Sequence, residues 1–211
     1  ARALASAHSL PFKGLKNKEM REFGPLLTDD TKEELILVDE QDSLIAPAAK
    51  LETHRRGDLH RAFSIFLFNP AGETLLQQRA AVKYHSRRKW ANTCCGHPRP
   101  GEDIGAAAAR RLTEELGLSA DLSFAFKARY RAELDNNMIE NEIVYVFRGL
   151  ALAPPIPNPS EVSTVRFAGL EALRDDLSRN PWNYAAWLQH YIRQHFDEIV
   201  TCRNDLARSA S

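Results

Sequence analysis

Three histidines and two glutamates carry side chains that could hold a metal ion. The histidines are His54, His60 and His97, and Glu140 and Glu142 are two residues apart on an expected strand, so both carboxylates face the same way. Two adjacent carboxylates repel each other unless a proton or a cation lies between them. Five such ligands exceed a tetrahedral zinc site and suit an octahedral manganese or magnesium ion. The alternatives are ordinary surface or core histidines and a solvated strand edge.

Cys95 is the candidate reactive thiol. It lies two residues before His97 and beside Gly96, which lets the backbone approach a ligand closely. If the segment is extended, Cys94 points the opposite way, so at most one of the two cysteines faces the site. One alternative is a buried inert cysteine, which is common for this residue type. The other is a zinc knuckle, which lacks a second Cys or His pair at finger-like spacing.

A pattern of charged residues begins directly after the thiol. It reads Gly96, Glu102, Arg110, Arg111, Leu112, Glu114, Glu115, Gly117 and Leu118. The pattern resembles the Nudix box, G-x5-E-x7-R-E-U-x-E-E-x-G-U with U aliphatic, except that Arg111 replaces the glutamate after the box arginine. In Nudix hydrolases that glutamate helps to hold the magnesium that activates water. An arginine there repels a cation and attracts phosphate. We interpret the segment as a scaffold that grips a diphosphate without the usual hydrolysis.

Three further basic residues join Arg111 as candidate diphosphate-binding cations. They are Lys50, Arg79 and Lys83. Scattered basic residues are usually solvated, and Arg111 could merely pair with Glu115, four residues later on the same helix. The replacement of an acidic box residue by Arg111 favours the diphosphate-binding interpretation.

Composition restricts the class of protein. The 211 residues suit one medium-sized domain with appendages. Lys plus Arg and Asp plus Glu both number 28, so the net charge of zero argues against nucleic acid as a partner. Three cysteines, two of them adjacent, argue against a disulfide framework and indicate a reducing, cytoplasmic location. No apolar run approaches the roughly 20 residues that cross a bilayer.

The expected secondary structure alternates irregularly between strands and helices. Strands are expected at 34–38, 60–68, 73–79, 122–133, 141–149 and 162–167, and helices at 103–116, 170–178 and 182–200. Strand 60–68 is apolar on both faces, as central strands usually are. The pattern predicts an α/β fold of mixed, α+β character, with a mixed sheet between helices rather than a doubly wound parallel sheet. Residues 1–33 are expected to be an extension, 34–200 the domain, and 201–211 a C-terminal tail that is frayed from Arg203.

Other histidines are interpreted as having no role at the site. His85 lies in a basic loop at 80–94, and His190 and His195 lie on the last expected helix.

Taken together, these residues resemble type I isopentenyl-diphosphate isomerase, a metal-dependent member of the Nudix superfamily. The resemblance extends from about residue 34 to about residue 190. The matching stretches are 59–64, 76–79, 90–98, 110–112, 115–117, 130–132, 140–142 and 181–182. It implies a Nudix-type α/β/α sandwich that converts isopentenyl diphosphate into dimethylallyl diphosphate, through a tertiary carbocation, in isoprenoid biosynthesis.

The resemblance also implies roles for individual residues. The first metal site, for Mn²⁺ or Mg²⁺, falls on His54, His60, His97, Glu140 and Glu142. A second magnesium ion, arriving with the substrate diphosphate, falls on Glu115 and the backbone carbonyl of Cys95. The diphosphate contacts fall on Lys50, Arg79, Lys83 and Arg111. The catalytic residues are Cys95 and Glu142, assisted by Tyr130, and Trp182 lines the hydrocarbon pocket. The expected partner is a small isoprenoid diphosphate, bound by a monomer or weak homodimer.

Two rival functions are less consistent with these residues than the isomerase. A Nudix pyrophosphohydrolase is disfavoured by Arg111, and it would leave the pair of Cys95 and Glu142 without a purpose. A non-enzymatic Nudix-like binding domain is disfavoured because the residues of a separate chemistry are all present.

Overall fold

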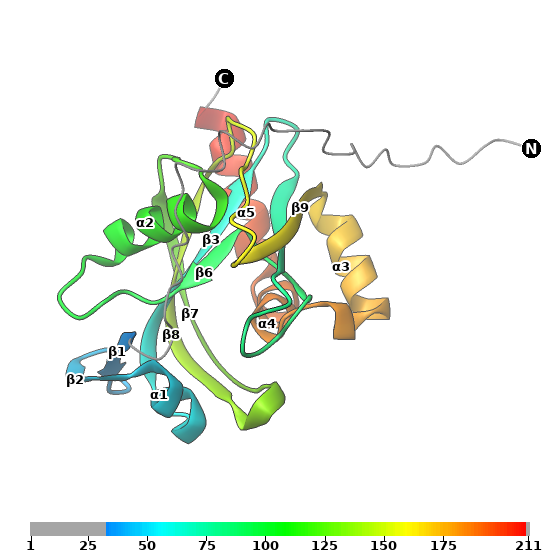
Figure 1. Ribbon diagram of the computed structural model, residues 1–211. Helices are drawn as coiled ribbons and strands as arrows, with labels where there is room; N and C mark the ends of the chain where they lie inside the picture. Colours follow the sequence, from blue (N-terminus) through cyan, green and yellow to red (C-terminus); the bar gives the residue numbers. More distant parts are fainter. Residues whose placement is uncertain (1–32, 210–211) are drawn as a thin grey trace, which may run out of the picture.

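The computed structural model describes residues 33–209, in which one mixed sheet forms the framework (Figure 1). The expected extension at 1–33 therefore lies outside the described residues, apart from Glu33. The strands of the described part are β1 (Glu34–Val38), β2 (Leu44–Ala49), β3 (His60–Phe68), β4 (Thr74–Arg79), β5 (Trp90–Ala91), β6 (Cys94–Gly96), β7 (Ser123–Glu133), β8 (Ile139–Leu150) and β9 (Val162–Ala168). The helices are α1 (Lys50–Arg56), α2 (Ile104–Leu116), α3 (Leu170–Arg179), α4 (Ala186–Gln194) and α5 (Phe196–Ser209), with short 3-10 turns η2 (Asp135–Asn137) and η3 (Pro181–Asn183).

Strand β3 is central, as its two apolar faces predict. It pairs in parallel with β8 over its whole length and antiparallel with β1, β4 and β6. Strand β8 continues the sheet into β7, and β4 continues it into β5 and β9. Helix α2 covers one face of β3 and helices α3, α4 and α5 cover the other, so neither face meets solvent, which explains its apolar run.

Two hydrophobic cores lie on opposite faces of this sheet. One face of β3, including Phe63 and Ile65, packs with α2. The other face, including Phe66, packs with α3, α4 and α5. Figure 1 shows α2 on one side of the strands and α4 and α5 on the other. The α/β/α sandwich is therefore confirmed.

Helix α2 carries the box pattern and has defined ends. The Asp103 side chain accepts a hydrogen bond from the Ala106 N–H at the first turn, and Gly117 ends the helix in the left-handed region with φ of 61°. The helix buries Arg111 and Glu115 as well as its apolar stripe. Charged side chains are rarely buried without partners, so this face of α2 belongs to a polar site.

The region after residue 180 differs from the sequence prediction. The expected helix at 182–200 is divided into η3, α4 and α5. Residues 184–185 pair with β5 instead, and the Ala185 N–H donates to the Trp90 carbonyl at 2.8 Å. The expected tail at 201–211 is also wrong over its described part, because α5 continues to Ser209 and buries Ile199 and Cys202.

The sequence analysis missed the short elements β2, α1, β5 and β6. Strand β2 and helix α1 follow β1 directly, and α1 carries Lys50 and His54. The length of α1, seven residues, is too short for a helical period to emerge. Within residues 33–209, no helix combines the length and apolar character needed to span a bilayer.

Candidate active site

The three histidines and two glutamates meet at one end of β3. The candidate ligand atoms of His54, His60, His97 and Glu140 all lie within 4.8 Å of one another. The His54 Nε2 atom is 3.1 Å from Glu140 Oε2. Glu142 Oε1 lies 3.0 Å from His97 Nε2 and 3.5 Å from His60 Nε2. Three regions that are far apart in the sequence, 54–60, 97 and 140–142, thus deliver five candidate ligands to one point.

Strand register explains how these residues come together. His60 is the first residue of β3 and pairs directly with Glu142 on β8. Glu140 lies two residues earlier on β8, so its carboxylate faces the same side. His54 comes from α1, and His97 directly follows β6, which pairs with β3.

The hydrogen bonds around the imidazoles fit a metal site. The Nδ1 atoms of His54 and His60 lie 2.7 Å and 2.9 Å from the carbonyls of Lys50 and Asp58. An Nδ1–H donated to each carbonyl leaves the Nε2 lone pair facing the cluster, which is the usual arrangement for metal-binding histidines. Among the described residues, buried His60 Nε2 has no hydrogen-bond partner. The cluster could therefore bind a divalent metal ion.

The two carboxylates are ionised in this arrangement. Burial acts to raise the pKa of Glu142, but His60 and the Tyr130 hydroxyl outweigh burial and hold that pKa below its ordinary value. For Glu140, burial and the charge of Glu142 act to raise the pKa. The charge and hydrogen bond of His54 outweigh them, so the pKa of Glu140 lies below its ordinary value. Two carboxylates held side by side and facing three imidazole rings are a strong attraction for a cation.

Manganese is expected to raise the melting temperature of metal-free protein by roughly 5–10 °C at about one hundred times its dissociation constant. The ion binds the folded cluster and removes the repulsion between the carboxylates. In the variant His60→Gln this increase should shrink to less than half, as measured by differential scanning calorimetry. The control is His195→Gln, because His195 pairs with Glu198 on the surface. An undiminished increase in His60→Gln would remove His60 from the metal site.

A cavity beside the cluster contains both candidate acid/base groups. Cys95, Glu142 and Tyr130 all line it. Tyr130 on β7 pairs directly with Glu142 on β8, which explains why the hydroxyl reaches the carboxylate. Cys94 is fully buried against α2 on the other face of the sheet, so the predicted opposite orientation of the two cysteines is confirmed. Burial raises the pKa of Cys95 to about 12, and the thiol is therefore protonated at neutral pH.

The four candidate cations also line this cavity. They are Lys50, Arg79, Lys83 and Arg111, and Glu115 lies among them. Arg111 donates to Glu115 at 2.5 Å and to Glu114 at 2.9 Å. Burial acts to lower the pKa of Arg111, but these carboxylates raise it well above its ordinary value. The arginine that replaces the box glutamate is thus a permanent positive charge at the cavity wall.

A buried glutamate that the sequence analysis missed pairs with two of these cations. Glu161 lies 2.9 Å from Lys83 Nζ and 3.4 Å from Arg111 Nη2. It precedes β9 in a loop, where no local pattern distinguishes it from a surface glutamate.

The prediction that Trp182 lines the pocket was wrong. The Trp182 side chain is 66% exposed and lies outside the cavity lining, whereas Trp187 lines the cavity. Trp182 belongs to the short turn η3, and Trp187 is on the buried face of α4. His85 lies nearer to the site than its position in a basic loop suggested, because it is buried, lines the cavity and lies 3.7 Å from Glu140.

Replacing Trp187 with leucine is expected to lower kcat/KM for the proposed reaction by about tenfold, because an indole face stabilises a cation by roughly 0.5–2 kcal/mol. The matched variant Trp182→Leu should stay within twofold of the parent protein. Steady-state kinetics of both variants decides between the two tryptophans. The assignment reverses if only Trp182→Leu is impaired.

The chain is similar to several known proteins. The NUDIX domain family matches residues 58–191. The chain is 46% identical to Isopentenyl-diphosphate Delta-isomerase 1 of Aromatoleum aromaticum over 174 residues, which is 82% of this chain and 96% of the relative. It is 47% identical to Isopentenyl-diphosphate Delta-isomerase 2 of Photorhabdus laumondii over 158 residues, or 75% and 89% of the two chains. Protein DR0079 from Deinococcus radiodurans shares the fold, with a TM-score of 0.65, 18% identity, and coverage of 77% of this chain and 98% of that chain.

Proposed function

Because this chain belongs to the isopentenyl-diphosphate Delta-isomerase family and contains a NUDIX domain, we propose that it converts isopentenyl diphosphate into dimethylallyl diphosphate. The observation that supports this most strongly is the shared cavity. A protonated thiol, Cys95, and a hydrogen-bonded carboxylate, Glu142, line one space that four cations also line. A hydrolase needs no such thiol, and a simple binding domain needs neither acid/base group.

The reaction moves one double bond and conserves the proton count. One proton is added to the terminal carbon of the alkene, and one is removed from C2, so the product is an isomer. An alkene is a very weak base, and its protonation needs a positioned acid and stabilisation of the resulting tertiary carbocation. We propose that Cys95 acts on one face of the flat intermediate and Glu142, supported by Tyr130, acts on the other. Trp187 would present its ring to the cation.

The four basic residues that line the cavity would retain the diphosphate during this chemistry. Lys50, Arg79, Lys83 and Arg111 would hold its negative charge, so that it does not leave from the allylic product. We propose Mn²⁺ or Mg²⁺ at the cluster of three histidines and two glutamates, and Mg²⁺ with the diphosphate at Glu115 and the Cys95 carbonyl. When bound, these ions would supply charge stabilisation and orientation.

The cellular setting follows from the same residues. Cys95 must stay reduced to act as an acid, and the cytoplasm is a compartment that keeps thiols reduced. All of the proposed site residues lie on one chain, so a monomer or a weak homodimer would suffice.

The decisive experiment is incubation of the purified protein with isopentenyl diphosphate and magnesium, followed by NMR. The expected result is the growth of dimethylallyl diphosphate signals without release of inorganic phosphate or pyrophosphate. Phosphate release without isomerisation would support the rival hydrolase. Binding without either product would support the non-enzymatic alternative.

A further inference from the structure

A chain of hydrogen bonds leads from helix α4 to the thiol. The Tyr191 hydroxyl is 2.8 Å from Ser64 Oγ, and Ser64 Oγ is 3.2 Å from Cys95 Sγ. On its other side the thiol donates to Asn92 Oδ1 at 3.1 Å. Asn92, Ser64 and Tyr191 are all at most 2% exposed, so their polar groups depend on one another rather than on bulk water.

The direction of this chain is determined by Asn92. Its amide nitrogen donates to the Ile65 carbonyl at 2.9 Å, so its oxygen is the atom that faces Cys95. An amide oxygen only accepts, and the thiol proton therefore points to Asn92. Ser64 must then donate to the sulfur. Because a hydroxyl has a single proton, Ser64 accepts from Tyr191, which is the donor at the start of the chain.

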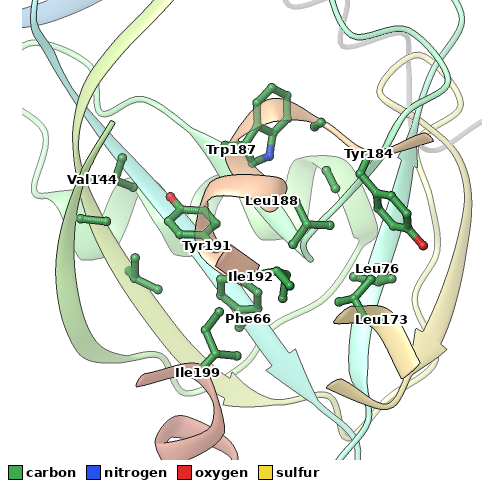
Figure 2. Close-up of a cluster of buried hydrophobic side chains, with 14 of the residues drawn as sticks. Phe66, Leu76, Val144, Leu173, Tyr184, Trp187, Leu188, Tyr191, Ile192 and Ile199 are labelled. Atoms are coloured by element: carbon green, nitrogen blue, oxygen red, sulfur yellow. The ribbon is translucent and has the colours of Figure 1, made fainter. Parts of the chain in front are cut away.

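Each member of the chain is held firmly by its own element. Ser64 on β3 and Cys95 on β6 are direct cross-strand partners, so both side chains lie on the same face. The Tyr191 ring is fully buried and packs edge-on against Phe66, with ring centroids 5.6 Å apart. Figure 2 shows Tyr191 within the core cluster, with its hydroxyl pointing away from Leu188 and Ile192.

Helix α4 therefore contributes two side chains to the site. Trp187 lines the cavity. Tyr191, one turn later on the same face of the helix, is linked to the Cys95 thiol through the Ser64 hydroxyl. A tyrosine hydroxyl in a core needs a partner, and here the partner is the group that contacts the candidate acid.

We propose that Tyr191 is a positioning residue for the Cys95 thiol and acts through Ser64. The chain holds the sulfur on the cavity face and keeps a hydroxyl proton directed at it. As the thiol transfers its proton to the alkene, negative charge develops on sulfur, and the Ser64 hydroxyl, oriented by Tyr191, stabilises that charge. This inference rests on the proposed function, because it assumes that Cys95 exchanges a proton with substrate.

Three variants test this chain of hydrogen bonds by steady-state kinetics. Ser64→Ala is expected to lower kcat at least about tenfold and Tyr191→Phe at least about fivefold, because each removes a donor to a developing charge, while KM changes less than twofold. The double variant should be no slower than Ser64→Ala, since both hydroxyls act through one bond to sulfur. The control is Tyr184→Phe, another fully buried tyrosine, whose hydroxyl contacts Asp176 and Arg166 outside the cavity.

The kinetic result can overturn the proposal in two ways. If Tyr191→Phe and Tyr184→Phe have the same kcat, the Tyr191 hydroxyl only makes a structural hydrogen bond in the core and does not act on the thiol. Losses that multiply in the double variant would show that Ser64 and Tyr191 act independently.

A second measurement needs no substrate and separates this inference from the proposed function. Iodoacetamide is applied at one fixed pH, and alkylation of the Cys95 peptide is followed by mass spectrometry. The rate should fall at least about threefold in Tyr191→Phe and remain at the parent value in Tyr184→Phe, because only Tyr191→Phe removes the hydrogen bond that orients Ser64 and holds the sulfur on the cavity face. Equal rates in all three proteins would overturn the proposal. If the parent protein fails to isomerise while Tyr191→Phe still slows alkylation, the proposed function fails and the link to the thiol stands.

Discussion

Replacing Cys95 with alanine is expected to lower kcat for isomerisation by about 10⁴-fold, the upper end of what one acid/base group contributes. The reason is chemical, because an alkene accepts a proton only from an acid placed directly against it. Alanine keeps the backbone carbonyl of residue 95 and fits the space, so the fold and the metal cluster should survive. The measurement is NMR of the dimethylallyl product, with circular dichroism and manganese binding as checks of integrity.

The adjacent cysteine provides a matched control. Cys94 is fully buried against α2, on the opposite face of the sheet from Cys95. Cys94→Ala should therefore retain turnover within about threefold and instead lose about 1 kcal/mol of unfolding free energy through the small cavity it leaves. Near-normal turnover in Cys95→Ala, or a total loss in Cys94→Ala, would contradict the assignment of the thiol.

Replacing Glu142 with glutamine is expected to lower kcat by at least about 10³-fold. Glutamine has the same shape but neither gives nor takes a proton at neutral pH. It also removes the negative charge that lies 3.0 Å from His97 and 3.5 Å from His60, so manganese affinity should fall as well. Steady-state kinetics and calorimetric titration with manganese measure the two effects separately.

Two further variants separate the roles of Glu142. Glu140→Gln weakens the metal cluster but leaves the Glu142 carboxylate beside Tyr130, so activity should return at saturating manganese. Glu142→Gln should stay inactive under the same conditions. Glu133→Gln, at the exposed end of β7, should behave like the parent protein. Recovery of Glu142→Gln at high manganese would mean that Glu142 is a metal ligand without a proton-transfer role.

Local sequence patterns determined the elements and the direction of many side chains. The two apolar faces of 60–68 predicted a central strand, because a strand in a sheet with helices packed on both sides buries both faces. The spacing of Glu140 and Glu142 placed both carboxylates on one face, and the adjacency of Cys94 and Cys95 placed the two thiols on opposite faces. The box pattern with Arg111, combined with the thiol segment, was specific enough to indicate the family.

Only the tertiary structure decided which distant residues share the cavity. Trp182 and Trp187 look equivalent in the sequence, and they separate because residues 184–185 pair with β5 and start a new helix. Glu161 and His85 lie in loops without a period, so the sequence could not show that Glu161 pairs with Lys83 and Arg111 or that His85 lines the cavity. Ser64 and Tyr191 look like ordinary core residues until β6 and α4 bring them to the thiol. Periodicity reports how a side chain points relative to its own element, whereas long-range pairing and packing determine what it meets there.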